Sequence, residues 1–136
     1  MDKIYIIMGK VYFISGHRDL TKEEFEKYYV PVIQEVIKND SNSPSFVVGD
    51  YEGCDYMAQV WLRNNYRPDK VTVYHMFTSP RHLASDKFNL SGGYKSDIER
   101  DSAMTSISDS DIAFIRHKRW TSGTAQNILR RYEKLE

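Results

Sequence analysis

Short apolar runs that alternate with helix-forming segments are the feature that most constrains the fold of this chain. The run at 11–14, Val-Tyr-Phe-Ile, is rich in β-branched and aromatic residues and ends at Ser15-Gly16. The runs at 45–48 and 71–74 have the same character. Runs without polar alternation are typical of strands buried on both faces, as in parallel sheets covered by helices. We therefore predict a parallel sheet with these segments at its centre.

Helical patterns separate the runs. Thr21 and Glu24 have the spacing of a capping box, and apolar residues then recur at helical spacing, which predicts a helix from Lys22 to Lys38 with a kink or break at Pro31. A second helix is expected over 54–63. The order strand, helix, strand, helix, strand implies parallel strands and right-handed crossovers. We expect an α/β fold: a Rossmann-like, three-layer structure with a mostly parallel sheet of four to five strands and helices on both faces.

The rest of the chain is expected to contain a long loop, two further helices and another strand. Residues 77–96 lose periodicity and predict a long loop, a kind of segment that is usually functional or mobile. A helix is expected over 98–106, a strand over 111–115 and a final helix over 123–135. The apolar stretch 4–7 forms either a hairpin with the next strand or the start of one long strand. At 136 residues, the whole chain (1–136) is expected to form one domain.

Charge and cysteine content limit the partners. Lys and Arg together number 19, as do Asp and Glu, so no global positive field favours a long nucleic acid, which we do not expect as a partner. The single cysteine, Cys54, excludes an internal disulfide and suits a reducing compartment. The apolar start lacks a signal-peptide cleavage site, and no run approaches the ~18 apolar residues of a membrane span. We expect a cytoplasmic protein without a membrane partner.

Three glycine-marked turns carry the functional prediction. They are Ser15–Asp19 and Gly49–Asp55, each directly after a strand, and Ser122-Gly123-Thr124, after a strand and a basic loop. In an open parallel sheet, ligands bind outside the carboxyl ends of the strands, where glycine lets the backbone approach and a helix start favours phosphate. We predict a pocket for a nucleotide-like, phosphate-bearing small molecule, with Ser122-Gly123-Thr124 as the phosphate cradle. The alternative is that each glycine serves only its own turn.

Two arginines are candidates for holding the phosphate. Arg18 and Arg100 each precede an aspartate, Asp19 and Asp101. Arginine binds phosphate through two parallel hydrogen bonds, and aspartate orients the arginine or binds ribose hydroxyls, although such pairs are also common as local structural contacts. The residues predicted around the ligand are Gly16, His17, Arg18, Asp19, Gly49, Gly53, Asp55, Arg100, Ser122, Gly123 and Thr124.

Other chemically distinctive residues receive simpler interpretations. His17 is either a hydrogen-bonding or acid–base group or a turn residue. The other histidines lack paired metal-ligand spacing, so we expect neither a metal nor another cofactor. Cys54 is interpreted as a packed residue at a helix start rather than as a nucleophile. The basic stretch Arg116-His117-Lys118-Arg119 is interpreted as a solvated loop beside the cradle.

The order of these motifs resembles the DprA/lonely-guy (SLOG) superfamily over about residues 10–132. The resemblance rests on five segments: Gly16-x-Arg18-Asp19, Gly49-x-x-x-Gly53-x-Asp55, Arg100-Asp101-x-x-Met104, Ser110-Asp111 and Ser122-Gly123-Thr124-x-x-Asn127-Ile128. It implies a Rossmann-like nucleotide-binding fold, frequent homodimers, so that we expect a homo-oligomer, and nucleotides or nucleotide-derived signals as ligands.

The same resemblance bears on catalysis. In the enzymatic lonely-guy branch, a glutamate after the Gly-Thr turn assists cleavage of the N-glycosidic bond of a nucleoside 5′-monophosphate. Here Gln126 stands at that place, and an amide serves as neither nucleophile nor base. Nucleoside 2-deoxyribosyltransferases are similar over the same stretch, with an aspartate to which Asp101 or Asp109 corresponds.

Three functions therefore stand as hypotheses. The first is a nucleotide-binding protein with a sensor or sequestering role. The second is an N-glycosidic enzyme, either a phosphoribohydrolase or a deoxyribosyltransferase, in which Asp101 or Glu99 replaces the missing glutamate. The third is a protein-interaction module with a vestigial pocket.

Overall fold

A computed structural model describes residues 10–116 and 122–135. All five strands are parallel and lie in one sheet in the order β4-β3-β2-β1-β5. This confirms the predicted Rossmann-like α/β fold, whereas the predicted strand at 4–7 falls outside the described residues. The strands are β1 (Val11–Ser15), β2 (Ser45–Val48), β3 (Val71–Met76), β4 (Asn89–Tyr94) and β5 (Ser110–Ala113).

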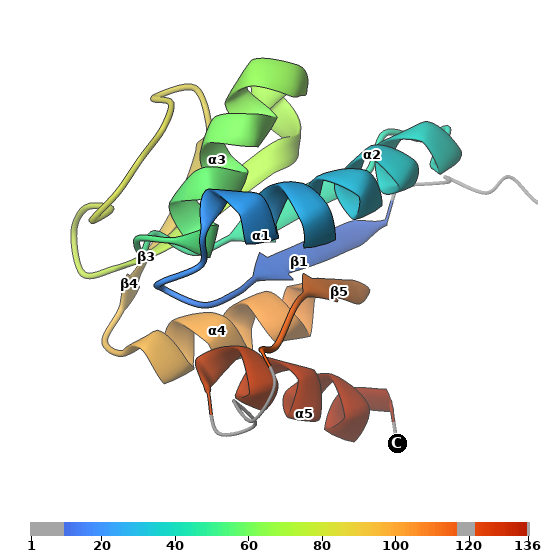
Figure 1. Cartoon of the computed structure of the whole chain (residues 1–136). Coiled ribbons are helices and arrows are strands. Elements are labelled where there is room, and N and C mark those ends of the chain that lie inside the picture. Colours follow the sequence, from blue (N-terminus) through green and yellow to red (C-terminus); the bar gives the residue numbers. More distant parts are fainter. Residues whose placement is uncertain (1–9, 117–121, 136) are drawn as a thin grey trace, which may run out of the picture.

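Helices cover both faces of the sheet (Figure 1). On one face lie α1 (Lys22–Tyr28), α2 (Val30–Asn39) and α3 (Cys54–Asn65), and on the other α4 (Asp97–Ile107) and α5 (Gly123–Leu135). A short 3-10 helix, η1 (Pro68–Lys70), leads into β3. No helix among residues 10–116 and 122–135 is long and apolar enough to cross a membrane.

The strands are apolar without alternation because each has neighbours on both faces. Ile14 and Val48 pack into the larger core cluster, which contains residues of α1, α2 and α3, whereas Phe13 and Val47 pack with Met104 of α4. Successive strand residues point to opposite faces, so a strand covered on both sides needs apolar side chains at consecutive positions.

The first predicted helix is interrupted, as anticipated, next to Pro31. The capping box is present, with Thr21 Oγ1 accepting the N–H of Glu24 at 3.1 Å and Glu24 accepting that of Thr21 at 3.0 Å. The helix is interrupted at Tyr29, and Pro31 falls in the first turn of α2, where a missing N–H costs no hydrogen bond. The hydroxyl of Tyr29 donates to the Ser15 carbonyl at 2.7 Å and accepts the Phe114 N–H at 2.9 Å, which ties together the ends of β1 and β5.

The expectation of a structureless loop over 77–96 is wrong in its second half. β4, with the sequence Asn-Leu-Ser-Gly-Gly-Tyr, pairs with β3 at the edge of the sheet. Glycine and serine give this segment weak strand propensity, and its strand conformation depends on pairing with β3. The preceding loop is anchored by buried Gln59, which donates to the His82 carbonyl at 3.2 Å and accepts the Ala84 N–H at 2.9 Å.

The strand order places a switch point beside β1. From β1 the chain adds β2, β3 and β4 in one direction, and then returns to place β5 on the opposite side of β1. The connections that leave β1 and β5 therefore diverge, and a crevice opens between them at the carboxyl ends of the strands. This is where the candidate site lies.

Candidate functional site

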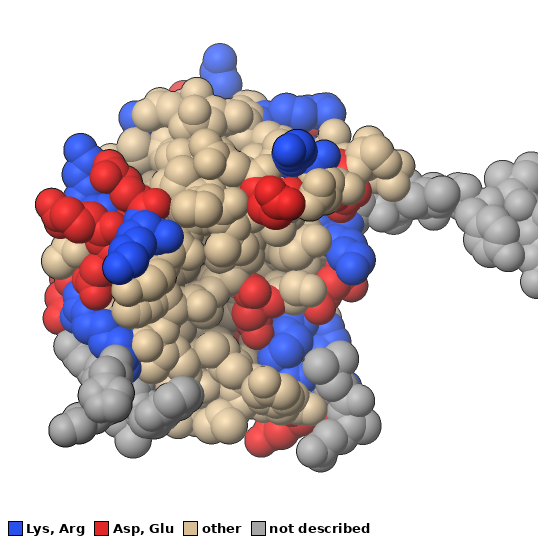
Figure 2. Space-filling view, turned by 45° about the vertical axis from the view of Figure 1, so that its right-hand side comes forward, with Lys and Arg blue, Asp and Glu red and all other residues tan. Residues whose placement is uncertain are grey.

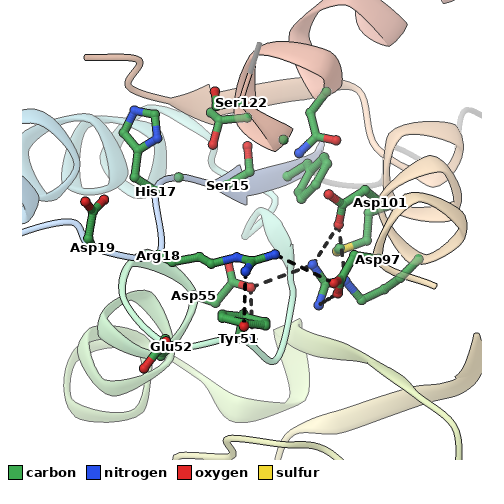
Figure 3. Close-up of a pocket in the computed structure, with 17 residues that line it drawn as sticks. Ser15, His17, Arg18, Asp19, Tyr51, Glu52, Asp55, Asp97, Asp101 and Ser122 are labelled. Carbon is green, nitrogen blue, oxygen red and sulfur yellow. Dashed lines mark hydrogen bonds and ion pairs between the residues drawn. The ribbon is translucent and has the colours of Figure 1, made fainter. Parts of the chain in front are cut away.

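A cavity of about 530 Å³ lies at this switch point. Its volume falls within the range of small-molecule sites, about 300–1,000 Å³. It brings together the turn after β1, the start of α3, the first turns of α4 and the start of α5, which are far apart in the sequence (Figure 3). The lining includes most of the residues predicted around a ligand: Gly16, His17, Arg18, Asp19, Asp55, Arg100, Ser122, Gly123 and Thr124.

Gly49 and Gly53 are absent from the lining and act behind it. A Cβ on Gly49 would lie 2.4 Å from Asp55 Oδ2 and 2.9 Å from Arg100 Cζ, so only glycine lets these two side chains approach the end of β2. Gly53 has a φ of +74°, and its Cβ would lie 2.0 Å from the Arg18 carbonyl oxygen. Both glycines thus hold pocket residues in place rather than facing a ligand.

One side of the cavity, the polar wall, consists of Ser15, Ser122, Gly123, Thr124 and Asn127. Ser122 Oγ accepts the N–H of Ala125 at 3.2 Å and caps α5. The first helical N–H groups, those of Gly123 and Thr124, have no intrahelical partner by the geometry of a helix start. A Cβ on Gly123 would meet no atom of the described residues within 4 Å, so the space that they leave beside this backbone is open.

Ser15 stands out on the polar wall. Its side chain is 5% exposed, and its hydroxyl has no hydrogen-bond partner within the described part of the chain. A buried hydroxyl without a partner costs free energy, about 1–3 kcal/mol, and calls for an explanation such as a ligand. Ser15 ends β1 and lines the cavity.

A second part of the lining, the acidic wall, consists of Asp55, Asp97 and Asp101 around Arg100 (Figure 3). The Arg100 side chain is 7% exposed and is surrounded by carboxylates. Its guanidinium lies 2.8 Å from Asp50, 2.9 Å from Asp101, 3.2 Å from Asp97 and 4.0 Å from Asp55. Arg100 is therefore committed to the protein's own carboxylates, which makes the predicted contact with a ligand phosphate less favourable.

The crowding of carboxylates changes their protonation. Burial, together with Asp101 and Asp50, raises the pKa of Asp55 to about 7, although Arg100 and the Tyr51 N–H oppose this rise. Burial also raises the pKa of Asp101, against the influence of Arg100 and of a hydrogen bond from Asn127. Asp55 thus exchanges a proton near neutral pH, inside the cavity.

A different arginine marks the mouth of the cavity. Arg18 is 64% exposed in its side chain; its guanidinium carbon lies 4.1 Å from the Tyr51 ring centroid, and its nearest carboxylate, Asp97, is 4.0 Å away. It also donates to the Tyr51 hydroxyl at 3.2 Å. Arg81 lies 4.4 Å from the same ring centroid and binds buried Asp50 at 2.8 Å.

The interpretation of Arg116 as part of a solvated loop is wrong. Its guanidinium lies 2.6 Å from Glu24 and 2.7 Å from Asp19, and its backbone N–H donates to Nε2 of buried His17 at 3.0 Å. The Arg116 hydrogen bond lowers the pKa of Glu24 to about 2. Arg116 therefore fixes the turn after β1 against the end of β5, whereas residues 117–119 lie outside the described residues.

Of the two catalytic candidates, Asp101 and Glu99, only Asp101 lies in the cavity. Asp101 lines the cavity, but Glu99 is exposed and accepts the Lys95 N–H at 3.0 Å. Gln126, taken in the sequence as the replacement for a catalytic glutamate, is exposed and points away, and its neighbour Asn127 faces the cavity. The buried polar and charged residues of α5, Thr124, Asn127 and Arg131, follow helical spacing, a signal that identifies Asn127 as inward-facing.

Cys54 is fully buried at the start of α3, as predicted. The residues of the cavity that sequence reasoning missed are Phe13, Ser15, Tyr51, Glu52, Asp97, Met104 and Asn127. Within residues 10–116 and 122–135, no group of three or more His, Cys, Asp or Glu side chains is placed to hold a metal ion.

Comparison with protein-family models, with curated proteins and with solved structures finds no match for this chain. The surface seen in Figure 2 carries acidic and basic side chains in small mixed groups. The cavity is therefore the feature from which a function is inferred.

Proposed function

We propose that this protein binds a nucleotide or nucleotide-derived small molecule in the cavity at the β1–β5 switch point, in a sensor or sequestering role. The observation that carries this proposal is that open backbone and hydroxyl groups and a cluster of carboxylates line one cavity. A nucleotide has the matching chemistry, with an anionic phosphate at one end and ribose hydroxyl donors beside it.

The phosphate is assigned to the polar wall. The Gly123 and Thr124 N–H groups begin α5, where the positive end of the helix dipole favours an anion. Ser15 lines the same wall, and its buried hydroxyl has no partner within the described residues, so it is available to a ligand oxygen once its side chain rotates toward the cavity. Arg18 is exposed and only weakly paired, so it has the freedom to reach the phosphate from the mouth.

The sugar is assigned to the acidic wall. Carboxylates accept hydrogen bonds from ribose hydroxyls and repel phosphate, so Asp101 and Asp55 favour the neutral part of the ligand. This orientation keeps the phosphate away from a wall on which Arg100 is already neutralised by aspartates. The resemblance to the SLOG superfamily, the cytoplasmic location and the homo-oligomer remain proposals that accompany this function.

The test is a calorimetric titration with AMP on Gly123→Val. Because an added Cβ at Gly123 meets open space, the variant should fold, yet its branched side chain would cover the first N–H groups of α5. We expect AMP affinity to fall at least tenfold. Gln126→Val is the matched control, since it places the same side chain on an exposed position of the same helix outside the cavity, and it should bind AMP like the wild type. Equal affinity in all three proteins would contradict the assignment.

An N-glycosidic enzyme is the second candidate, favoured by the position of Asp101 in the cavity. In hydrolysis, water adds to the anomeric carbon while the base leaves with a proton, and positive charge develops on the sugar. Asp101 is placed to stabilise that charge, and Asp55, with a pKa of about 7, to exchange the proton. Glu99, outside the cavity, has no part in this candidate.

Turnover separates the two candidates. Asn127, the α5 residue that faces the cavity, is a neutral amide and provides neither a negative charge nor a base, so we expect binding of AMP with little or no release of adenine. The measurement is chromatographic detection of free base after prolonged incubation. Robust release that is abolished in Asp101→Asn and preserved in Gln126→Ala would place the enzyme first.

A further inference from the structure

The mouth of the cavity already holds a planar cation on an aromatic ring. The Arg18 guanidinium lies 4.1 Å from the Tyr51 ring centroid and 4.0 Å from Asp97, and its side chain is 64% exposed. A flat, delocalised positive charge over a tyrosine face is attracted by the ring's electron density. Tyr51 lines the cavity, so a planar cationic group of a ligand could contact the same ring.

The charges around the cavity favour a positive ligand group at this place. Five carboxyl groups line it, those of Asp19, Glu52, Asp55, Asp97 and Asp101, together with the guanidiniums of Arg18 and Arg100. Asp55, with a pKa of about 7, is only partly ionised at neutral pH, and Asp19 pairs with Arg116 at 2.7 Å. Arg100 is buried and directed to its own aspartates. If Arg18 moves away, Arg81 remains 4.4 Å from the Tyr51 ring centroid, and Asp97 remains paired with Arg81 at 2.8 Å and Arg100 at 3.2 Å. The loss of the Arg18 charge still makes the field at the ring more negative than before.

We propose that the face of Tyr51 binds the planar cationic ring of an N-glycoside, such as a pyridinium nucleotide, and that this ring takes the place of the Arg18 guanidinium. This inference rests on the proposed function, because it requires the ribose phosphate of the same ligand to reach the polar wall. The displaced Arg18 then pairs with the phosphate. The ion pair of Arg18 with Asp97 is replaced by its ion pair with the phosphate, and the contact of Arg18 with the Tyr51 ring is replaced by that of the ligand's cationic ring.

A pair of probes that differ in one ring charge tests the inference. Nicotinamide mononucleotide has a pyridinium ring, and its reduced dihydro form has the same amide, ribose and phosphate but a neutral ring. We expect the oxidised form to bind at least tenfold more tightly to the wild-type protein in calorimetry. AMP, titrated in parallel, reports the proposed nucleotide binding independently of ring charge.

Variants of the ring locate the preference. Tyr51→Leu should remove the difference between the oxidised and reduced probes, and Tyr51→Phe should keep it because the ring remains. Tyr56→Leu is the matched control, since Tyr56 is 39% exposed on α3 and lies outside the cavity lining. Arg18→Ala should bind nicotinamide riboside, which lacks phosphate, about threefold more tightly, because the competing guanidinium is gone.

The outcomes are distinguishable. If AMP binds but the oxidised and reduced mononucleotides bind equally, the cationic-ring inference is overturned and the proposed function stands. A preference that persists in Tyr51→Leu overturns the assignment to this ring. If neither AMP nor either mononucleotide binds to the folded wild-type protein, the proposed function itself fails.

Discussion

Arg18 and Arg100 look alike in the sequence and differ completely in the structure. Each precedes an aspartate and lines the same cavity, yet Arg18 is 64% exposed with one carboxylate at 4.0 Å, whereas Arg100 is 7% exposed among four. An arginine that is surrounded by buried carboxylates holds the protein together, and one that is exposed at a cavity mouth has capacity left for a ligand. Exposure and pairing, rather than the Arg-Asp motif, thus separate a structural arginine from a ligand-binding one.

The largest effect is expected at the buried arginine. Arg100→Ala leaves Asp55 and Asp101 without their shared counter-ion in a buried site and leaves Asp50 with Arg81 alone, so the free energy of unfolding should fall by about 3–5 kcal/mol. Urea denaturation measures this loss. Arg18→Ala is the paired variant, and its free energy of unfolding should stay within about 0.5 kcal/mol of the wild type. Equal free energies of unfolding for the two variants would contradict the structural role of Arg100.

The next effect concerns binding at the exposed arginine. Arg18→Ala should weaken AMP binding by about 1.5–3 kcal/mol, because a charge-assisted bond to phosphate is lost, and leave adenosine binding unchanged. Parallel calorimetric titrations with the two ligands measure the difference. A similar loss for AMP and adenosine would mean that Arg18 shapes the cavity rather than holding the phosphate.

A smaller effect tests the carboxylates around Arg100 through pH. The pKa of Asp55 is raised from 3.8 to about 7, so the folded protein keeps a proton that the unfolded chain releases. Stability should therefore fall as the pH rises from about 4 to 7, and Asp55→Asn should make this fall distinctly shallower. Asp101, whose pKa is also raised, leaves part of the slope in place.

Urea denaturation at intervals from pH 4 to 8 gives these slopes. Asp86→Asn is the control, since Asp86 is exposed in the loop before β4, and it should keep the wild-type slope. If Asp55→Asn has the same slope as the wild type, the buried proton on Asp55 does not exist.

The sequence predicts the layout of the sheet well because that layout depends on local patterns. Consecutive apolar residues at 11–14 and 46–48 indicate strands covered on both faces, and the glycine turns after them indicate the edge at which ligands bind. β4 is missed because its Ser-Gly-Gly core has no strand pattern of its own and depends on pairing with β3.

The site is predicted less completely because its chemistry depends on residues far apart in the chain. Arg100 becomes structural through Asp50, fifty residues away, and Arg116 is fixed by Glu24, ninety-two residues away. Asn127 is within reach of sequence reasoning, since it follows Thr124 by three residues on one face of α5, whereas the unpartnered hydroxyl of Ser15 becomes visible only in three dimensions.

A crystal structure of the protein with bound AMP tests the central claim most directly. We expect the phosphate oxygens within hydrogen-bond distance of the Gly123 and Thr124 N–H groups and the ribose hydroxyls at Asp101 or Asp55, with Arg100 still bound to Asp50. AMP bound in the opposite direction, with its phosphate against Arg100, or bound outside this cavity, would contradict the account.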